Sequence, residues 1–180
     1  MNIEPIAGRY AQALFDIGVE TGKLKTIVDE ISSFADAYVS SPELRAAVGN
    51  PLISLSNRDG LLRELSNRMG LGDVSRSTIR LLASRNRLMA LPAIARTLRR
   101  MNDDKDGVVR AVVVSAKVLS ESYAQRLRGA LEQMTGKRVL LTREVDPSLI
   151  AGVVTRVGDT VIDGSLRARL NELRDRLLAN

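Results

Sequence analysis

The chain has 180 residues, of which 44% are hydrophobic and 27% are charged, and its formal net charge is +6. These values are typical of a soluble protein with one domain of ordinary size or two small ones. Cysteine and histidine are both absent, which excludes disulfides and removes the commonest general base and metal ligand. The composition therefore argues against catalysis, and we expect no catalytic residue, cofactor, metal ion or small-molecule substrate.

No apolar run reaches the roughly 18 residues that a membrane-spanning helix needs. The first residues, Met1 to Pro5, lack the basic and apolar segments of a secretory signal. The basic excess is even, at +3 for residues 1–105 and +3 for residues 106–180. Nucleic-acid binding is compatible with this charge but not required by it, and an aromatic content of 3% makes base stacking improbable.

The first hundred residues have apolar side chains at helical spacing. Ser41-Pro42 is a typical helix start, Ser56 to Asp59 resembles a capping box, and Gly22 and Gly70 are typical helix ends. These signals divide the segment into six short helices with short connections, which is the pattern of a helical bundle. The predicted helices cover residues 6–19, 24–38, 42–48, 56–69, a stretch around 79–83, and 92–101.

The pattern changes at the polar run Asn102 to Gly107, which we predict to be a domain boundary. The residues after it alternate between β-branched runs and one amphipathic helix, and a second helix ends the chain. We therefore predict an α+β protein with a six-helix bundle in residues 1–105 and a smaller β-α-β-β-β-α domain in residues 106–180. The predicted strands cover 108–114, 139–145, 149–157 and 160–163, and the helices run from Ser120 to Gly136 and onward from Ser165.

Two features could suggest chemistry but have ordinary structural uses. Gly152 and Gly158 flank a strand and a hairpin, whereas a phosphate loop leads from a strand into a helix. The carboxylates of Asp146, Asp159 and Asp163 occupy a turn, a hairpin loop and the approach to a helix cap, where aspartate is common. We interpret all five residues as structural.

Arginines cluster at Arg96, Arg99 and Arg100 and again between Arg167 and Arg176. Such clusters on amphipathic helices are usually solvated faces. Contact with an acidic partner is a second interpretation, and contact with nucleic acid is a third.

The first helix has two apolar stripes where a bundle helix needs one. One interpretation is a helix that is buried on two sides, and the other is a groove that accepts a partner helix. The stripes are Ile6, Tyr10, Ala13, Ile17 and Ala7, Ala11, Phe15, Gly18.

Three segments resemble the delta subunit family of F-type ATP synthases, which includes the mitochondrial oligomycin-sensitivity-conferring protein. They are Ala7 to Phe15, the pair Asn86-Arg87-Leu88 with Leu91-Pro92, and the stretch from Val145 to Ser165. Together they cover nearly the whole chain. Ala151 and Thr155 depart from the family pattern, in a strand rather than in the helical half.

The resemblance implies a non-catalytic stator subunit that couples proton translocation to ATP synthesis. The helical domain would bind the N-terminal helix of an alpha subunit through its first and fifth helices, and the smaller domain would bind the C-terminal region of subunit b. The matching positions are Ile6, Tyr10, Ala13, Thr78 and Leu81, with Tyr10 as the anchor.

We expect a peripheral location on the cytoplasmic face of a bacterial inner membrane, without nucleic acid or a membrane span. The alternative hypothesis from the residues alone is a small helical nucleic-acid-binding protein.

Overall fold

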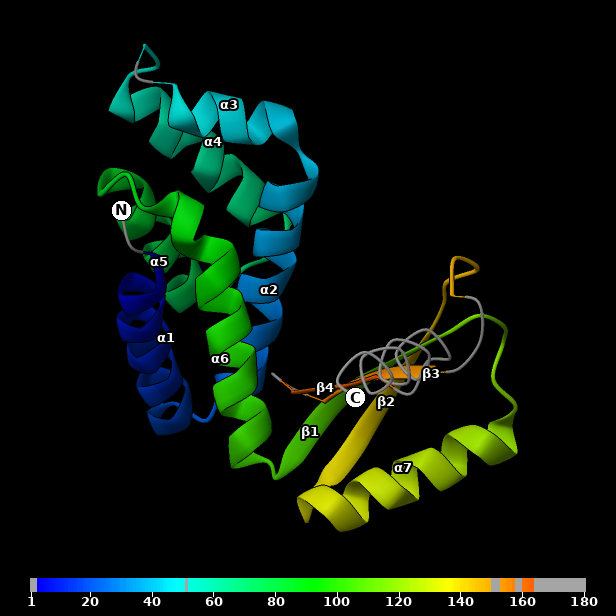
Figure 1. Ribbon diagram of the computed structural model, residues 1–180. Helices are drawn as coiled ribbons and strands as arrows, with labels where there is room; N and C mark the ends of the chain where they lie inside the picture. Colours follow the sequence, from blue (N-terminus) through cyan, green and yellow to red (C-terminus); the bar gives the residue numbers. More distant parts are fainter. Residues whose placement is uncertain (1–2, 51, 150–152, 158–159, 164–180) are drawn as a thin grey trace, which may run out of the picture. The chain divides into compact units, whose positions relative to one another are not determined.

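The computed structural model describes residues 3–50, 52–149, 153–157 and 160–163. The chain divides into two compact units, Met1–Asn102 and Asp103–Asn180, and each is described by itself. Helices and a sheet are both present, so the protein has the mixed α and β composition that the sequence predicts (Figure 1). None of the helices in the described residues is long and apolar enough to cross a membrane.

The first unit is built from helices, and the last of them continues into the start of the second unit. Two of the predicted signals are confirmed: Ser41 caps the third helix by accepting a hydrogen bond from the Leu44 amide at 3.1 Å, with Pro42 as the first helical residue. The helices are α1 (Ile3–Glu20), α2 (Leu24–Ser40), α3 (Pro42–Gly49), α4 (Leu55–Arg68), α5 (Asp73–Ser84), the 3-10 helix η1 (Leu88–Ala90) and α6 (Leu91–Lys105).

The start of α4 differs from the sequence prediction. The cap is Ser54 rather than Ser56, and its hydroxyl accepts a hydrogen bond from the Asn57 amide at 3.2 Å. Both serines stand before a polar stretch, so the local pattern alone does not distinguish them. The consequence is that α4 begins at Leu55.

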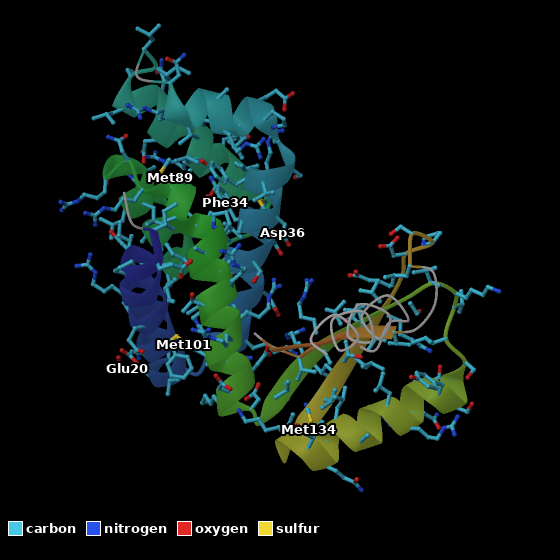
Figure 2. All side chains as sticks on the ribbon, in the orientation of Figure 1. Glu20, Phe34, Asp36, Met89, Met101 and Met134 are labelled. Carbon is cyan, nitrogen blue, oxygen red and sulfur yellow. The ribbon has the colours of Figure 1, made fainter. Side chains whose placement is uncertain are left out.

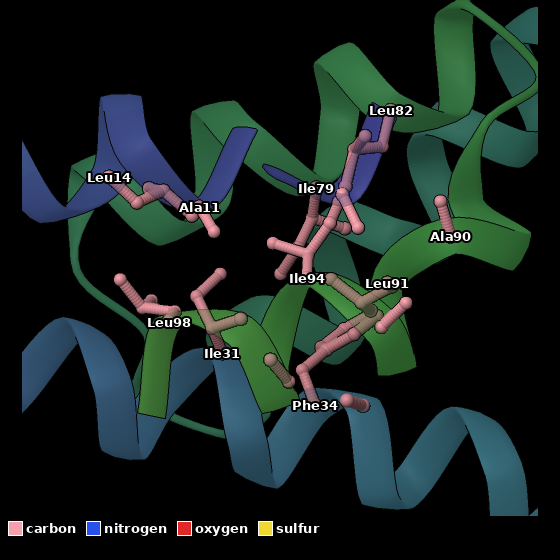
Figure 3. Packing of buried hydrophobic residues seen from close by; sticks show 14 of the residues in the cluster. Ala11, Leu14, Ile31, Phe34, Ile79, Leu82, Ala90, Leu91, Ile94 and Leu98 are labelled. Atoms are coloured by element: carbon pink, nitrogen blue, oxygen red, sulfur yellow. The ribbon is translucent and has the colours of Figure 1, made fainter. Parts of the chain in front are cut away.

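One apolar core holds the first unit together, and Figure 3 shows its centre. α1 contributes both small and large side chains, Ala7 and Ala11 together with Ile6 and Leu14. The largest fully buried side chains come from α2, α4, α5 and α6: Ile31, Phe34, Leu62, Ile79, Leu82, Leu91, Ile94 and Leu98.

The second unit contains a four-stranded sheet of order β2-β1-β3-β4. β1 and β2 are parallel, as a connection through a helix requires, while β1–β3 and β3–β4 are antiparallel. The element order β-α-β-β-β is therefore the predicted one up to Asp163. The elements are β1 (Val108–Ser115), α7 (Glu121–Thr135), β2 (Arg138–Val145), β3 (Val153–Val157) and β4 (Thr160–Asp163).

α7 covers one face of this sheet. Leu131 of α7 is buried against Ala111, Val139 and Val157 of three strands. Ser120 caps the helix, and Gly136 ends it at φ 64°, a left-handed conformation that glycine adopts without steric cost.

Several predictions fall outside the described residues. They are the hairpin loop Gly158-Asp159, Gly152, and the final helix from Ser165 with its arginines. The third strand begins at Val153, whereas the prediction began it at Leu149, which follows the turn at Asp146.

Candidate functional site

α1 presents two different faces to its surroundings. Ala7, Ala11 and Leu14 are almost fully buried in the core, and Figure 3 shows Ala11 and Leu14 directed into the same interior as Ile79 of α5. The adjoining face includes the exposed Ala13 and Ile17. The stripe through Ala7 and Ala11 is therefore the core stripe.

The five predicted partner-binding residues occupy different environments. Ile6 is only 7% exposed and belongs to the core, whereas Tyr10 and Thr78 are half-buried and Ala13 is exposed. Leu81 of α5 is 46% exposed. The structure thus leaves Tyr10, Ala13, Thr78 and Leu81 accessible, and their contact with a partner stays a prediction.

Tyr10 connects α1 to the turn that follows α5. Its hydroxyl accepts a hydrogen bond from the Arg87 guanidinium at 3.4 Å, and its ring packs against the core. Arg87 belongs to the Asn86-Arg87-Leu88 motif. Because Tyr10 and Arg87 are 77 positions apart, no local pattern in the sequence predicts this hydrogen bond.

A close approach at Gly18 fixes α1 against α2. A Cβ atom added at Gly18 would lie 2.8 Å from the Leu24 Cα, closer than real Cβ atoms come to other atoms. Gly8, on the same helix, has no atom within 4 Å of such a Cβ.

These two glycines predict opposite effects on stability. We expect Gly18→Ala to lower the free energy of unfolding by about 1–3 kcal/mol, because a backbone atom must move to accommodate the new methyl group. Gly8→Ala should raise it by roughly 0.5–1 kcal/mol, because alanine favours the helix interior. Urea denaturation of both variants checks this, and equal effects would contradict the close packing at Gly18.

Glu30 of α2 fixes the beginning of α5. Its carboxylate accepts hydrogen bonds from the Gly72 amide at 3.0 Å and the Ser75 hydroxyl at 2.5 Å. A carboxylate at a helix N-terminus satisfies free amides and complements the helix dipole. Because Glu30 lies more than 40 residues before α5, sequence reasoning did not find this contact.

Asp59 joins α4 to α5 through two arginines. Its carboxylate accepts from Arg80 at 2.6 and 3.1 Å and from Arg63 at 3.0 Å. The hydrogen bond from Arg80 is the largest cause that holds the pKa of Asp59 below its ordinary value of 3.8. The carboxylate is a third exposed, so salt weakens the contact.

The lowered pKa of Asp59 predicts a pH-dependent contribution to stability. The contribution is present above the ordinary pKa of 3.8 and is lost as the pH falls through the lower pKa of the folded state. We therefore expect Asp59→Asn to be less stable than the parent near neutral pH, and the difference to shrink well below pH 3.8. Denaturant titrations of both proteins, near neutral pH and well below pH 3.8, check this. A difference in the free energy of unfolding that grows in acid would contradict it.

The carboxylates of the described residues do not form a metal site. Among them no group of three or more carboxylates could hold a metal ion. Asp146 accepts a hydrogen bond from the Ser148 amide at 2.9 Å, which is typical of a turn. Hydrogen bonding from the Ser148 side chain, and then from its amide, lowers the pKa of Asp146. This is the structural use that the sequence predicts for Asp146.

Comparison with known proteins decides between the two hypotheses from the sequence. The family model described as "ATP synthase delta (OSCP) subunit" matches residues 6–177. The chain belongs to the ATP synthase delta (OSCP) subunit family. Members of this family are structural subunits, so the chain is a non-catalytic stator subunit of an F-type ATP synthase.

Relatives named ATP synthase subunit delta, and one chain of a solved ATP synthase structure, each match nearly the whole chain. The ATP synthase subunit delta of Anaeromyxobacter sp. (strain Fw109-5) is 42% identical, with 96% of each chain covered. That of Desulfatibacillum aliphaticivorans is 37% identical, covering 96% of this chain and 94% of its own. A chain of the Toxoplasma gondii mitochondrial ATP synthase hexamer has a TM-score of 0.75 at 25% identity, covering 97% of this chain and 98% of that one.

Proposed function

We propose that residues 1–105 hold the catalytic head of the ATP synthase and that residues 106–180 hold its peripheral stalk. In this proposal α1–α6 act as one six-helix bundle that binds the N-terminal helix of an alpha subunit. The sheet and α7 belong to the domain that binds the C-terminal region of subunit b. The site of action is the cytoplasmic face of a bacterial inner membrane, and the organisms of the relatives support this location.

The single observation that carries the proposal is the exposed apolar surface on α1 and α5. Ile17 of α1 is 39% exposed, and Leu81 of α5 is 46% exposed. Large apolar side chains that stay in water favour contact with the apolar face of another helix. Tyr10, half-buried on α1, supplies an aromatic anchor with its own hydrogen bond.

The contacts behind this surface support a rigid platform. Gly18 fixes α1 against α2, Glu30 of α2 fixes the start of α5, and Asp59 joins α5 to α4. A surface that keeps its shape before binding loses less conformational entropy on binding. This suits a joint that must persist over many turnovers.

The role of such a joint is mechanical. A rotor that turns inside the head exerts torque on it, and the head turns with the rotor unless a stator holds it. Slow dissociation from both partners is therefore the property that the function requires, and it favours a buried apolar contact. Proton translocation stays coupled to ATP synthesis as long as this joint holds.

The experiment that tests the proposal is a calorimetric titration of the full chain with a peptide of the N-terminal segment of the cognate alpha subunit. We expect one-to-one binding of this peptide and no binding of a control peptide with the same residues in scrambled order. The affinity should depend only weakly on salt, because the contact is apolar. Absence of binding at tens of micromolar peptide would contradict the proposed contact with the alpha subunit. Binding that disappears with added salt would contradict its apolar character.

A further inference from the structure

A pocket of about 410 Å³ opens in the first unit, with walls from the end of α2, from α3 and α4, from the end of α5, and from η1 and the turn before it. Its volume lies in the range of pockets that bind small groups. The sequence motif Asn86-Arg87-Leu88 borders it. The lining residues are Tyr38, Val48, Gly49, Arg58, Ala83, Asn86, Leu88 and Met89.

Arg58 supplies a positive charge to this pocket without a carboxylate partner among the described residues. One terminal nitrogen donates to the carbonyl oxygen of Val48 and to Oδ1 of Asn86, both at 3.3 Å. Its Nε is buried and has no hydrogen-bond partner in the described part of the chain. A buried guanidinium donor without a partner is costly, and an anionic acceptor satisfies it best.

The other walls of the pocket combine apolar surface with a phenol. Val48 and Leu88 are buried, and Met89, labelled in Figure 2, is 55% exposed. The phenol hydroxyl of Tyr38 is protonated at neutral pH and can donate, and burial raises its pKa further. An aliphatic side chain beside a carboxylate would therefore find complementary groups here.

The surrounding segment has a positive charge that favours an anionic partner. Residues 42–90 contain eight arginines and four carboxylates. An excess of this kind attracts acidic groups over longer range than the contact itself.

We propose that this pocket binds a carboxylate with a neighbouring aliphatic side chain, presented by an acidic segment of a partner protein. The site is separate from the exposed surface of α1 and α5 and does not depend on the function proposed for that surface. The turn after α5 reaches both surfaces: Asn86 and Leu88 line the pocket, while Arg87 donates to the Tyr10 hydroxyl. Asn86 adopts φ 53° in this turn, a left-handed conformation that asparagine tolerates.

The test is a nuclear magnetic resonance titration of the nitrogen-15-labelled full chain with N-acetyl-L-leucine. We expect a saturable shift of the Arg58 Nε–Hε resonance, and no such shift with N-acetyl-L-leucinamide, which lacks the carboxylate. Arg58→Gln should weaken the binding of the carboxylate probe roughly tenfold, because a charged hydrogen bond is lost. Arg68→Gln is the matched control on the same helix, since Arg68 is exposed and pairs with Glu64 outside the pocket.

A second variant keeps the proposal testable if Arg58→Gln does not fold. Met89→Ala removes part of the apolar wall and should weaken binding of the probe roughly fivefold. Binding to this variant would be measured from the shifts of the backbone amide resonances of the residues that line the pocket. Equal shifts with the carboxylate and the amide would overturn the proposal. Unchanged affinity in both pocket variants would overturn it as well.

Discussion

Replacing Tyr10 with alanine should weaken binding of the alpha-subunit peptide by roughly thirtyfold, about 2 kcal/mol, because a buried aromatic anchor commonly contributes this much to an interface. The ring already packs against the core and is held by Arg87 before any partner arrives. Little conformational entropy is therefore lost when a partner covers it. Calorimetry with the full chain measures the change directly.

Tyr10→Phe is the matched control for this variant. The hydroxyl has one described contact, a long hydrogen bond of 3.4 Å to Arg87, so the phenylalanine should bind the peptide almost as well as the parent. Circular dichroism of both variants checks that the helices stay folded. If Tyr10→Ala folds normally and binds the peptide with parental affinity, then Tyr10 is not the anchor and the partner lies elsewhere.

The largest effect on stability is expected from Phe34→Ala. Phe34 of α2 is fully buried in the core of the first unit, part of which Figure 3 shows. Truncating a buried phenylalanine removes its transfer free energy and leaves a cavity, which together cost about 3–5 kcal/mol. Urea denaturation monitored by the helical signal should show this loss in the transition of the first unit.

Leu52→Ala provides the comparison for the core substitution. Leu52 is 91% exposed, so its truncation should change the free energy of unfolding by less than about 0.5 kcal/mol. A loss below about 1 kcal/mol for Phe34→Ala would contradict the described core.

The sequence predicts local features of the helices and strands because the causes lie within a few residues. Ser41 with Pro42 specifies a helix start, and the β-branched run after Gly107 specifies a strand; both are confirmed. The cap at Ser54 was missed because Ser56 stands in an equally suitable polar stretch two residues later.

The sequence does not predict contacts between distant segments. Glu30 reaches the start of α5, and Arg87 reaches Tyr10, but neither contact has a signal within its own segment. The two stripes of α1 show the same limit. Their spacing predicts two apolar faces, while only the packing shows that Ala7 and Ala11 face the core and that Ile6, from the other stripe, is buried with them.

Retention of the catalytic head on membranes tests the stator role most directly. The starting material is membranes that carry the synthase subunits outside the catalytic head but lack this chain. These membranes would be mixed with the head, washed, and assayed for ATP-driven proton pumping. We predict that the head is lost without the chain, and that adding the purified chain restores both retention and pumping. Full retention and coupled pumping in its absence would contradict the role of the chain as the joint between head and stalk.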